Sequence, residues 1–255
     1  MGLHLREMGA ADGRRVLFLH PGNATGASWA DVVADLPGVR GLCPDLPGFG
    51  KSGAIPLEDF ACSADHVAAL LRAQPDAAPL PVVGYSLGGY TGLMLAARHP
   101  DLVSRALLTG FQVVPVSGRW WLGPLSVAIS PLMTRSFFRR RAFAALGLSG
   151  NTSWSPGPRS PCDARTLRRI ADLAFSFEAR DEIERIAVPL TVLAGRQEMR
   201  DIRDTVKLIT ETAENARGGF ALGGHGWPAV SHDLFVATVR AWLDDAPLPA
   251  GIEPV

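Results

Sequence analysis

The segment Leu80–Gly89, LPVVGYSLGG, contains the pattern G-x-S-x-G at residues 84–88. The residues before this pattern form a continuous apolar run, which is typical of a strand buried on both faces. The residues after it, 87–98, carry apolar side chains at helical spacing. Glycines on both sides of a sharp turn avoid collisions with neighbouring backbone. The segment therefore predicts a strand, a tight turn and a helix, with Ser86 exposed in the turn as a nucleophile.

The same alternation of strand and helix continues on both sides of this segment. Apolar runs predict strands at residues 16–19, 39–43, 80–85, 106–109, 190–194 and, more weakly, 219–222. Helical spacing predicts helices at residues 60–71, 87–98, 202–212 and 234–243. Strands that alternate with helices of this length favour the α/β class, with a mostly parallel central sheet and helices on both faces.

Residues 112–186 interrupt the alternation. They contain no run typical of a strand, several aromatic side chains, and a middle part rich in Ser, Pro and Gly at residues 149–161. We predict that residues 112–186 form a mostly helical insertion, or lid. Residues 1–111 and 187–255 would then form the core domain.

The composition excludes several classes of partner. Lys plus Arg and Asp plus Glu each number 25, so the formal net charge is zero. Neither an overall field nor a basic run favours nucleic acid or an anionic membrane, and no apolar stretch is long enough to span a bilayer. The N-terminal residues lack the features of a signal peptide. We expect a cytoplasmic monomer or homodimer whose partner is a small molecule, with no nucleic-acid or membrane partner.

No cofactor motif is found in the sequence. The three cysteines, Cys43, Cys62 and Cys162, show no CxxC spacing, and no metal, phosphate-loop or dinucleotide motif is present. We therefore expect three unpaired thiols, no metal and no cofactor.

Several motifs, in their order along the chain, resemble those of the α/β-hydrolase superfamily. His20–Asn23 (HPGN) follows the first predicted strand, where the superfamily has its oxyanion loop. Asp45–Ser52 (DLPGFGKS) resembles the pattern D-x-P-G-x-G-x-S, Gly84–Gly89 resembles the nucleophile turn, and Ala97–Pro100 (ARHP) also falls where the superfamily has it. The resemblance covers nearly the whole chain, and it implies a lid-containing enzyme with a serine nucleophile.

The resemblance also implies a catalytic triad in the chain order serine, acid, histidine. His225 lies between the last predicted strand and the last predicted helix, where the superfamily carries its base, and His232 at the start of that helix is the alternative. His20 resembles a structural histidine that braces the oxyanion loop. His4, His66 and His99 are expected to be solvated.

The acid departs from the usual pattern. The superfamily has G-x-x-D after its seventh strand, and this chain has GRQE at residues 195–198, after the strand predicted at 190–194, so the resemblance implies Glu198 as the acid. A glutamate can orient a histidine as an aspartate does. Asp201 is the alternative.

The oxyanion hole is expected to consist of two backbone N–H groups, because developing negative charge needs donors that are already in place. Leu87, directly after the nucleophile, supplies one of them. The resemblance implies Gly22 as the second, and Asn23 is the alternative because Pro21 alters the loop.

These residues predict a serine hydrolase that cleaves a small-to-medium lipophilic ester, lactone or thioester through an acyl-enzyme on Ser86. The aromatic insertion favours an apolar or aromatic substrate, although a buried seam between lid and core explains the same side chains. The motifs also resemble carbon–carbon-cleaving members and the menaquinone-pathway member that eliminates pyruvate. A lyase of a biosynthetic pathway, using the same triad for proton abstraction, is therefore the alternative function. A non-catalytic binding protein is a third reading, which the intact set of serine, histidine and acid disfavours.

Overall fold

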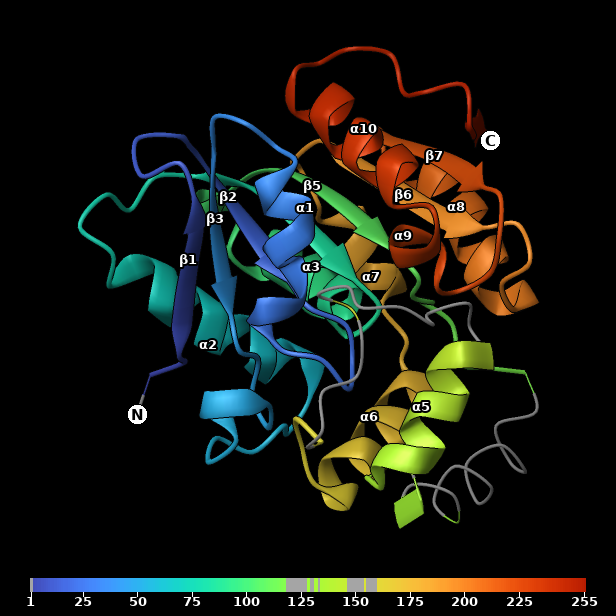
Figure 1. The fold of residues 1–255 in the computed structure, drawn as a ribbon. Helices are drawn as coiled ribbons and strands as arrows, with labels where there is room; N and C mark the ends of the chain where they lie inside the picture. The colour runs from blue at the N-terminus through green and yellow to red at the C-terminus, as the bar shows by residue number, and fades with distance from the viewer. Residues whose placement is uncertain (1, 118–127, 129–130, 133, 146–153, 155–159) are drawn as a thin grey trace.

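The computed structural model describes residues 2–117, 128, 131–132, 134–145, 154 and 160–255 (Figure 1). Its centre is an eight-stranded sheet with the order β1-β3-β2-β4-β5-β6-β7-β8. The strands are β1 (Leu5–Gly9), β2 (Arg14–Leu19), β3 (Val39–Pro44), β4 (Leu80–Tyr85), β5 (Val103–Thr109), β6 (Leu190–Gly195), β7 (Ala216–Ala221) and β8 (Ile252–Pro254). The six inner strands, β3, β2, β4, β5, β6 and β7, run parallel to one another. Strands β1 and β8 pair antiparallel with them at the two edges.

Helices cover both faces of this sheet. The α-helices among the described residues are α1 (Ala30–Ala34), α2 (Phe60–Arg72), α3 (Leu87–Arg98), α5 (Ser136–Ala145), α6 (Ala164–Ser176), α7 (Arg180–Glu184), α8 (Arg200–Thr212), α9 (Trp227–Val230) and α10 (His232–Leu243). Side chains of α1 and α10 share one buried cluster, and those of α2, α3, α7 and α8 share another. The predicted α/β class, a mostly parallel sheet with helices on both faces, is confirmed.

Strand β2 shows why the central strands contain apolar runs; in β2 the run spans residues 16–19. Successive side chains of a strand point to opposite faces of the sheet. Leu17 and Leu19 accordingly lie in the cluster that contains α2, α3 and α8, and Val16 and Phe18 lie in the cluster that contains α1 and α10. A strand covered on both faces therefore needs a continuous apolar run, which is the pattern that the sequence shows.

The described part of residues 112–186 contains α5, α6 and α7 and no strand. In Figure 1, α5 and α6 lie at the lower right, beyond the sheet. Helix α6 packs its apolar side chains, among them Ile170, Leu173 and Ala174, against the core cluster that includes α2 and α3. Trp120, Trp121 and Met133, part of the aromatic and apolar content of the predicted lid, lie outside the described residues. The boundaries of the lid at 112–186 remain a prediction.

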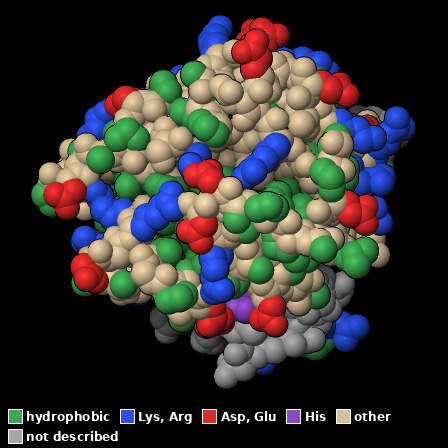
Figure 2. Space-filling view, turned by 90° about the horizontal axis from the view of Figure 1, so that it is seen from above, with side chains coloured by type: hydrophobic (Ala, Val, Ile, Leu, Met, Phe, Trp, Pro, Cys, Tyr) green, Lys and Arg blue, Asp and Glu red, His purple; other side chains and the backbone are tan. Residues whose placement is uncertain are grey.

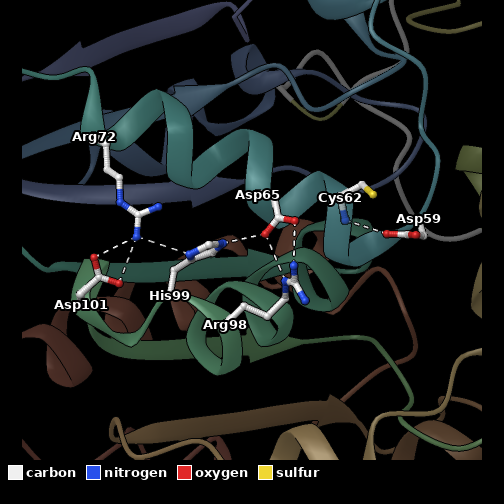
Figure 3. A network of polar contacts seen from close by, with 7 residues as sticks. All are labelled: Asp59, Cys62, Asp65, Arg72, Arg98, His99 and Asp101. Atoms are coloured by element: carbon white, nitrogen blue, oxygen red, sulfur yellow. Dashed lines mark hydrogen bonds and ion pairs between the residues drawn. The ribbon is translucent and has the colours of Figure 1, made fainter.

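A polar network joins α2 to α3, the helix that follows the nucleophile turn (Figure 3). Asp65 accepts hydrogen bonds from Arg98 Nη2 at 2.8 Å and His99 Nε2 at 2.7 Å. The hydrogen bond from Arg98 lowers the pKa of Asp65. Arg72 Nη2 donates to Asp101 at 3.0 Å and also contacts His99 Nδ1. The expectation that His99 is solvated is wrong, because these partners leave only 17% of its side chain exposed.

The surface carries both signs of charge. Acidic, basic and hydrophobic side chains are interspersed over the face seen in Figure 2. Among the described residues, no helix combines the length and the hydrophobicity needed to cross a bilayer.

Candidate active site

Ser86 lies in a strained turn between β4 and α3. Its backbone has φ 53° and ψ −113°, a region that side-chain-bearing residues rarely adopt, and its N–H donates to Thr109 O at 2.8 Å. A Cβ atom on Gly84 would lie 2.3 Å from Gly88 O, and one on Gly88 would lie 1.9 Å from Leu19 O. Both glycines are therefore required by the approach of neighbouring backbone, as the sequence predicted.

The imidazole of His225 connects Ser86 to Glu198. His225 Nε2 lies 3.1 Å from Ser86 Oγ, and His225 Nδ1 lies 2.6 Å from Glu198 Oε1. A carboxylate oxygen accepts, so Nδ1 carries the hydrogen and Nε2 is free to accept from the serine hydroxyl. The order Glu198, His225, Ser86 is the arrangement in which a histidine can take a proton from a serine.

Glu198 is held from both sides. Its side chain is fully buried, and its second oxygen, Oε2, accepts from Gly195 N at 2.9 Å. Buried carboxylates need such partners, because an unpaired charge loses its hydration without compensation. The tight turn that starts at Gly195 thus fixes the carboxylate toward His225.

The alternative residues lie elsewhere. His232 Nε2 pairs with Asp35 Oδ2 at 2.7 Å, and Asp201 accepts from Ser117 Oγ at 2.9 Å. The structure therefore brings Ser86, His225 and Glu198 together, and it does not bring His232 or Asp201 to them. The catalytic roles of the three residues remain predictions.

Two further residues, Tyr85 and Gly110, lie against His225, and the sequence did not single them out. The hydroxyl of Tyr85 donates to His225 O at 2.6 Å. Gly110 has φ 74°, and a Cβ atom there would lie 3.1 Å from His225 Cε1. Tyr85 occupies a position that G-x-S-x-G leaves unspecified, so only the fold reveals its contact with a residue 140 positions away.

His20 has the bracing position that the resemblance implied. Its Nδ1–H donates to Pro21 O at 2.8 Å, and its Nε2 accepts from Leu46 N at 2.9 Å. Burial lowers the pKa of His20 to about 4, which keeps the ring neutral and preserves this pair of hydrogen bonds. The ring thereby ties the loop after β2 to the loop after β3.

The predicted oxyanion residues lie on two different segments. Leu87 is the first residue of α3, where the N–H groups of a helix have no partner within the helix. Gly22 and Asn23 form the turn after His20, and Asn23 has φ 62°, which asparagine tolerates better than most residues. Within the described residues, Asn23 Oδ1 is buried without a hydrogen-bond partner. The assignment of Leu87, Gly22 and Asn23 to an oxyanion hole remains a prediction.

Helix α6 lies beside Gly22 and Gly48, in the loops after β2 and β3. A Cβ atom on Gly22 would lie 3.5 Å from Ile170 Cδ1, and one on Gly48 would lie 2.7 Å from Thr166 Cγ2. The predicted insertion thus supplies apolar atoms directly beside Gly22. Across the part of the chain that the structure describes, no group of three or more His, Cys, Asp and Glu side chains could hold a metal ion.

Comparisons with known proteins place this geometry in context. Residues 14–155 match the protein family described as alpha/beta hydrolase fold. An AB hydrolase superfamily protein of Gibberella zeae is 24% identical over 250 residues, which cover 95% of this chain and 84% of that protein. A pimeloyl-(acyl-carrier protein) methyl ester esterase of Neisseria meningitidis is 36% identical over 97 residues, 38% of this chain and 36% of the esterase. The match thus spans about a third of the esterase.

A solved structure agrees with the fold over most of the chain. The crystal structure of a hydrolase from Pseudomonas aeruginosa PA01 superposes with a TM-score of 0.80 and 20% sequence identity, covering 94% of each chain. At this level of identity, the similarity shows the fold alone.

Proposed function

The chain belongs to the alpha/beta hydrolase fold family, and from this premise we propose that it is a serine hydrolase of the esterase type. Its substrate is a small-to-medium lipophilic ester, lactone or thioester, and the reaction passes through an acyl-enzyme on Ser86. The observation that carries the proposal is the unbroken chain of hydrogen bonds from Glu198 through His225 to Ser86.

Each member of this chain has a defined task. Ser86 Oγ attacks the substrate carbonyl while His225 Nε2 takes its proton, and Glu198 stabilises the imidazolium that forms. His225 then returns the proton to the leaving group. A water molecule, activated by the same histidine, attacks the acyl-enzyme and releases the acid. Burial of Glu198 strengthens its effect, since water does not screen its charge from His225.

The oxyanion of the tetrahedral intermediate is bound by the N–H groups of Leu87 and Gly22, with Asn23 as the alternative donor. These groups belong to rigid backbone at the start of α3 and in the loop that His20 braces. Donors fixed in advance stabilise developing charge without reorganising during the reaction.

An apolar acyl group fits the surroundings of the oxyanion loop. Ile170 of α6 lies next to Gly22, and α6 is anchored on the core by its apolar side chains. Residues 112–186 would act as a lid that excludes water from the active site. The name of the relative from Neisseria meningitidis also indicates cleavage of a carboxylic ester.

Two reagents test the proposal: a fluorophosphonate probe measures labelling of the nucleophile, and an activated aryl ester measures turnover. The wild-type protein should be labelled once, at Ser86, and should turn over the ester. Ser86→Ala should remove labelling and reduce turnover by about 10⁴-fold or more without unfolding the protein.

The histidine variants form a matched pair. His225→Ala should cost several orders of magnitude in turnover, whereas His232→Ala removes only a surface contact with Asp35 and should leave turnover unchanged. Labelling of a different residue, or equal losses in the two histidine variants, would contradict the proposed mechanism. Product formation without an acyl-enzyme would instead indicate an elimination.

A further inference from the structure

A cavity of about 540 Å³ lies beside α8, and the proposed hydrolysis does not use it. Its lining consists of Arg196, Arg200, Arg203, Asp204, Lys207 and Phe220. Helix α8 covers β6 and β7 at one end of the sheet (Figure 1), and Arg196 belongs to the loop that follows β6. The cavity is thus lined by the exposed side of α8, by the loop after β6 and by Phe220 of β7.

The basic residues share one side of the helix because of their spacing. Arg200, Arg203 and Lys207 are three and four positions apart, and residues at this spacing are neighbours on a helix surface. The opposite side of α8 is buried against the core through Ile202 and Val206. Replacement of the basic side chains therefore leaves the packing of α8 intact.

The charges of the cavity are not balanced. Arg196 pairs with Glu253 of β8, and Arg200 Nε lies 3.1 Å from Asp204 Oδ2. Arg203 and Lys207 have no acidic partner within the part of the chain that the structure describes. In a protein with equal numbers of acidic and basic residues, this excess of positive charge is local. A concave site with one sign of charge concentrates the field and attracts counter-ions of the opposite sign.

We propose that this cavity binds a phosphate-bearing small molecule through Arg203 and Lys207, with Arg196 and Arg200 at its rim. A guanidinium can bind a phosphate with two parallel hydrogen bonds, and an ammonium adds a compact charge. Two cations without partners match a ligand with at least two negative charges. The volume exceeds that of one phosphate group and lies within the range of small-molecule sites. The partly buried ring of Phe220 offers an apolar surface for the organic part of the ligand.

Calorimetric titration with ADP and with pyrophosphate tests the proposal on the full chain. Wild-type protein should bind ADP saturably, one molecule per chain, in the millimolar range or more tightly. Pyrophosphate should bind more weakly, because it cannot contact Phe220. Binding should weaken at high salt, since the cations are exposed.

A double variant and a matched control complete the experiment. R203Q/K207Q should weaken ADP binding at least about tenfold, the loss expected from charge-assisted hydrogen bonds. Arg185 is also exposed but lies outside the cavity, and R185Q should leave the affinity unchanged. Thermal denaturation should show that both variants are folded. The proposal is overturned if ADP does not bind saturably, if both variants lose affinity equally, or if citrate binds as tightly as pyrophosphate. These results are independent of ester turnover, so they do not bear on the proposed hydrolysis.

Discussion

Glu198 carries one methylene more than the aspartate of the pattern G-x-x-D, and the turn that contains it accommodates the extra length. Glu198 N donates to Gly195 O at 3.0 Å while its Oε2 accepts from Gly195 N, so the side chain folds back over its own turn. Its other oxygen is thereby directed at His225. The position of the acid could be predicted from the motif, but this reciprocal contact could not, because it depends on the backbone of the turn.

Glu198→Gln should therefore lower kcat by about 10³- to 10⁴-fold, because an amide keeps the shape but cannot stabilise the imidazolium. Glu198→Asp should cause an intermediate loss, since the carboxylate withdraws from His225 by about one bond length. Steady-state kinetics with an aryl ester measure both effects. The control is Asp201→Asn, which retains an oxygen acceptor for Ser117 and should leave kcat nearly unchanged. A large loss in the control and none in Glu198→Gln would exclude Glu198 as the acid.

The two tyrosines of the chain allow a matched test of how His225 is positioned. Both are buried, and burial raises the pKa of each hydroxyl, so both remain neutral donors. Tyr85 donates to His225 O, whereas Tyr90 donates to Gln112. Tyr85→Phe should lower kcat about tenfold with little change in KM, because it frees the backbone that carries the imidazole.

Tyr90→Phe should lower the free energy of unfolding by about 1 kcal/mol, because it removes a buried hydrogen bond, and it should leave kcat unchanged. Equal kcat values for the two variants would show that the hydroxyl of Tyr85 has only a structural role.

At the scale of the element, the nucleophile turn is set by contacts between backbones. Helix α3 begins at Leu87 and ends at Arg98, the bounds that helical spacing predicted. It lies so close to β2 that Gly88 has no room for a side chain. Gly92, one turn later, faces a different neighbour, since a Cβ atom there would lie 2.6 Å from the Leu108 Cδ2 methyl.

Gly88→Ala should destabilise the protein by about 3 kcal/mol, because the backbone at Leu19 cannot move without disturbing β2. Gly92→Ala should cost less than about 1 kcal/mol, because a leucine methyl can shift and alanine favours the helix. Denaturant unfolding of both variants measures the difference. A Gly88→Ala protein as stable as Gly92→Ala would mean that α3 does not lie against β2 as described.

Elements at the edges of the sheet were harder to predict than those at its centre. The six predicted strands are all present, but β1 and β8 were missed. Strand β1 has the sequence LREMG and is largely exposed or half-buried, and β8 has only three residues. An edge strand that is not covered on both faces needs no continuous apolar run, so its sequence lacks the pattern by which the central strands were recognised.

At the scale of the whole molecule, stability depends on pH through a residue that takes no part in the chemistry. Burial lowers the pKa of His20 from 6.5 to about 4, so between these values the ring is neutral in the folded protein and protonated in the unfolded chain. The unfolded chain then binds more protons, and acidification favours it. The difference corresponds to roughly 3 kcal/mol, which is present above pH 6.5 and lost as the pH falls through about 4.

The free energy of unfolding of the wild-type protein should therefore fall as the pH drops from 7 to 4. In His20→Gln the starting stability should be lower and the fall should be smaller by about 3 kcal/mol. Urea titrations at several pH values measure both slopes, and the other titrating groups cancel in the comparison. Parallel slopes would show that His20 is not buried in the neutral form.

The proposed mechanism also has a consequence for the chain during its synthesis, because the three proposed catalytic residues lie far apart in the sequence. His225 is 139 residues beyond Ser86 and 27 beyond Glu198, and it follows β7. Domains generally fold as units during synthesis, so a core that lacks β7 is incomplete. Under the proposed mechanism, Ser86 has no base until β7 and the loop that follows it have been translated, so a chain that ends before His225 should not turn over an ester.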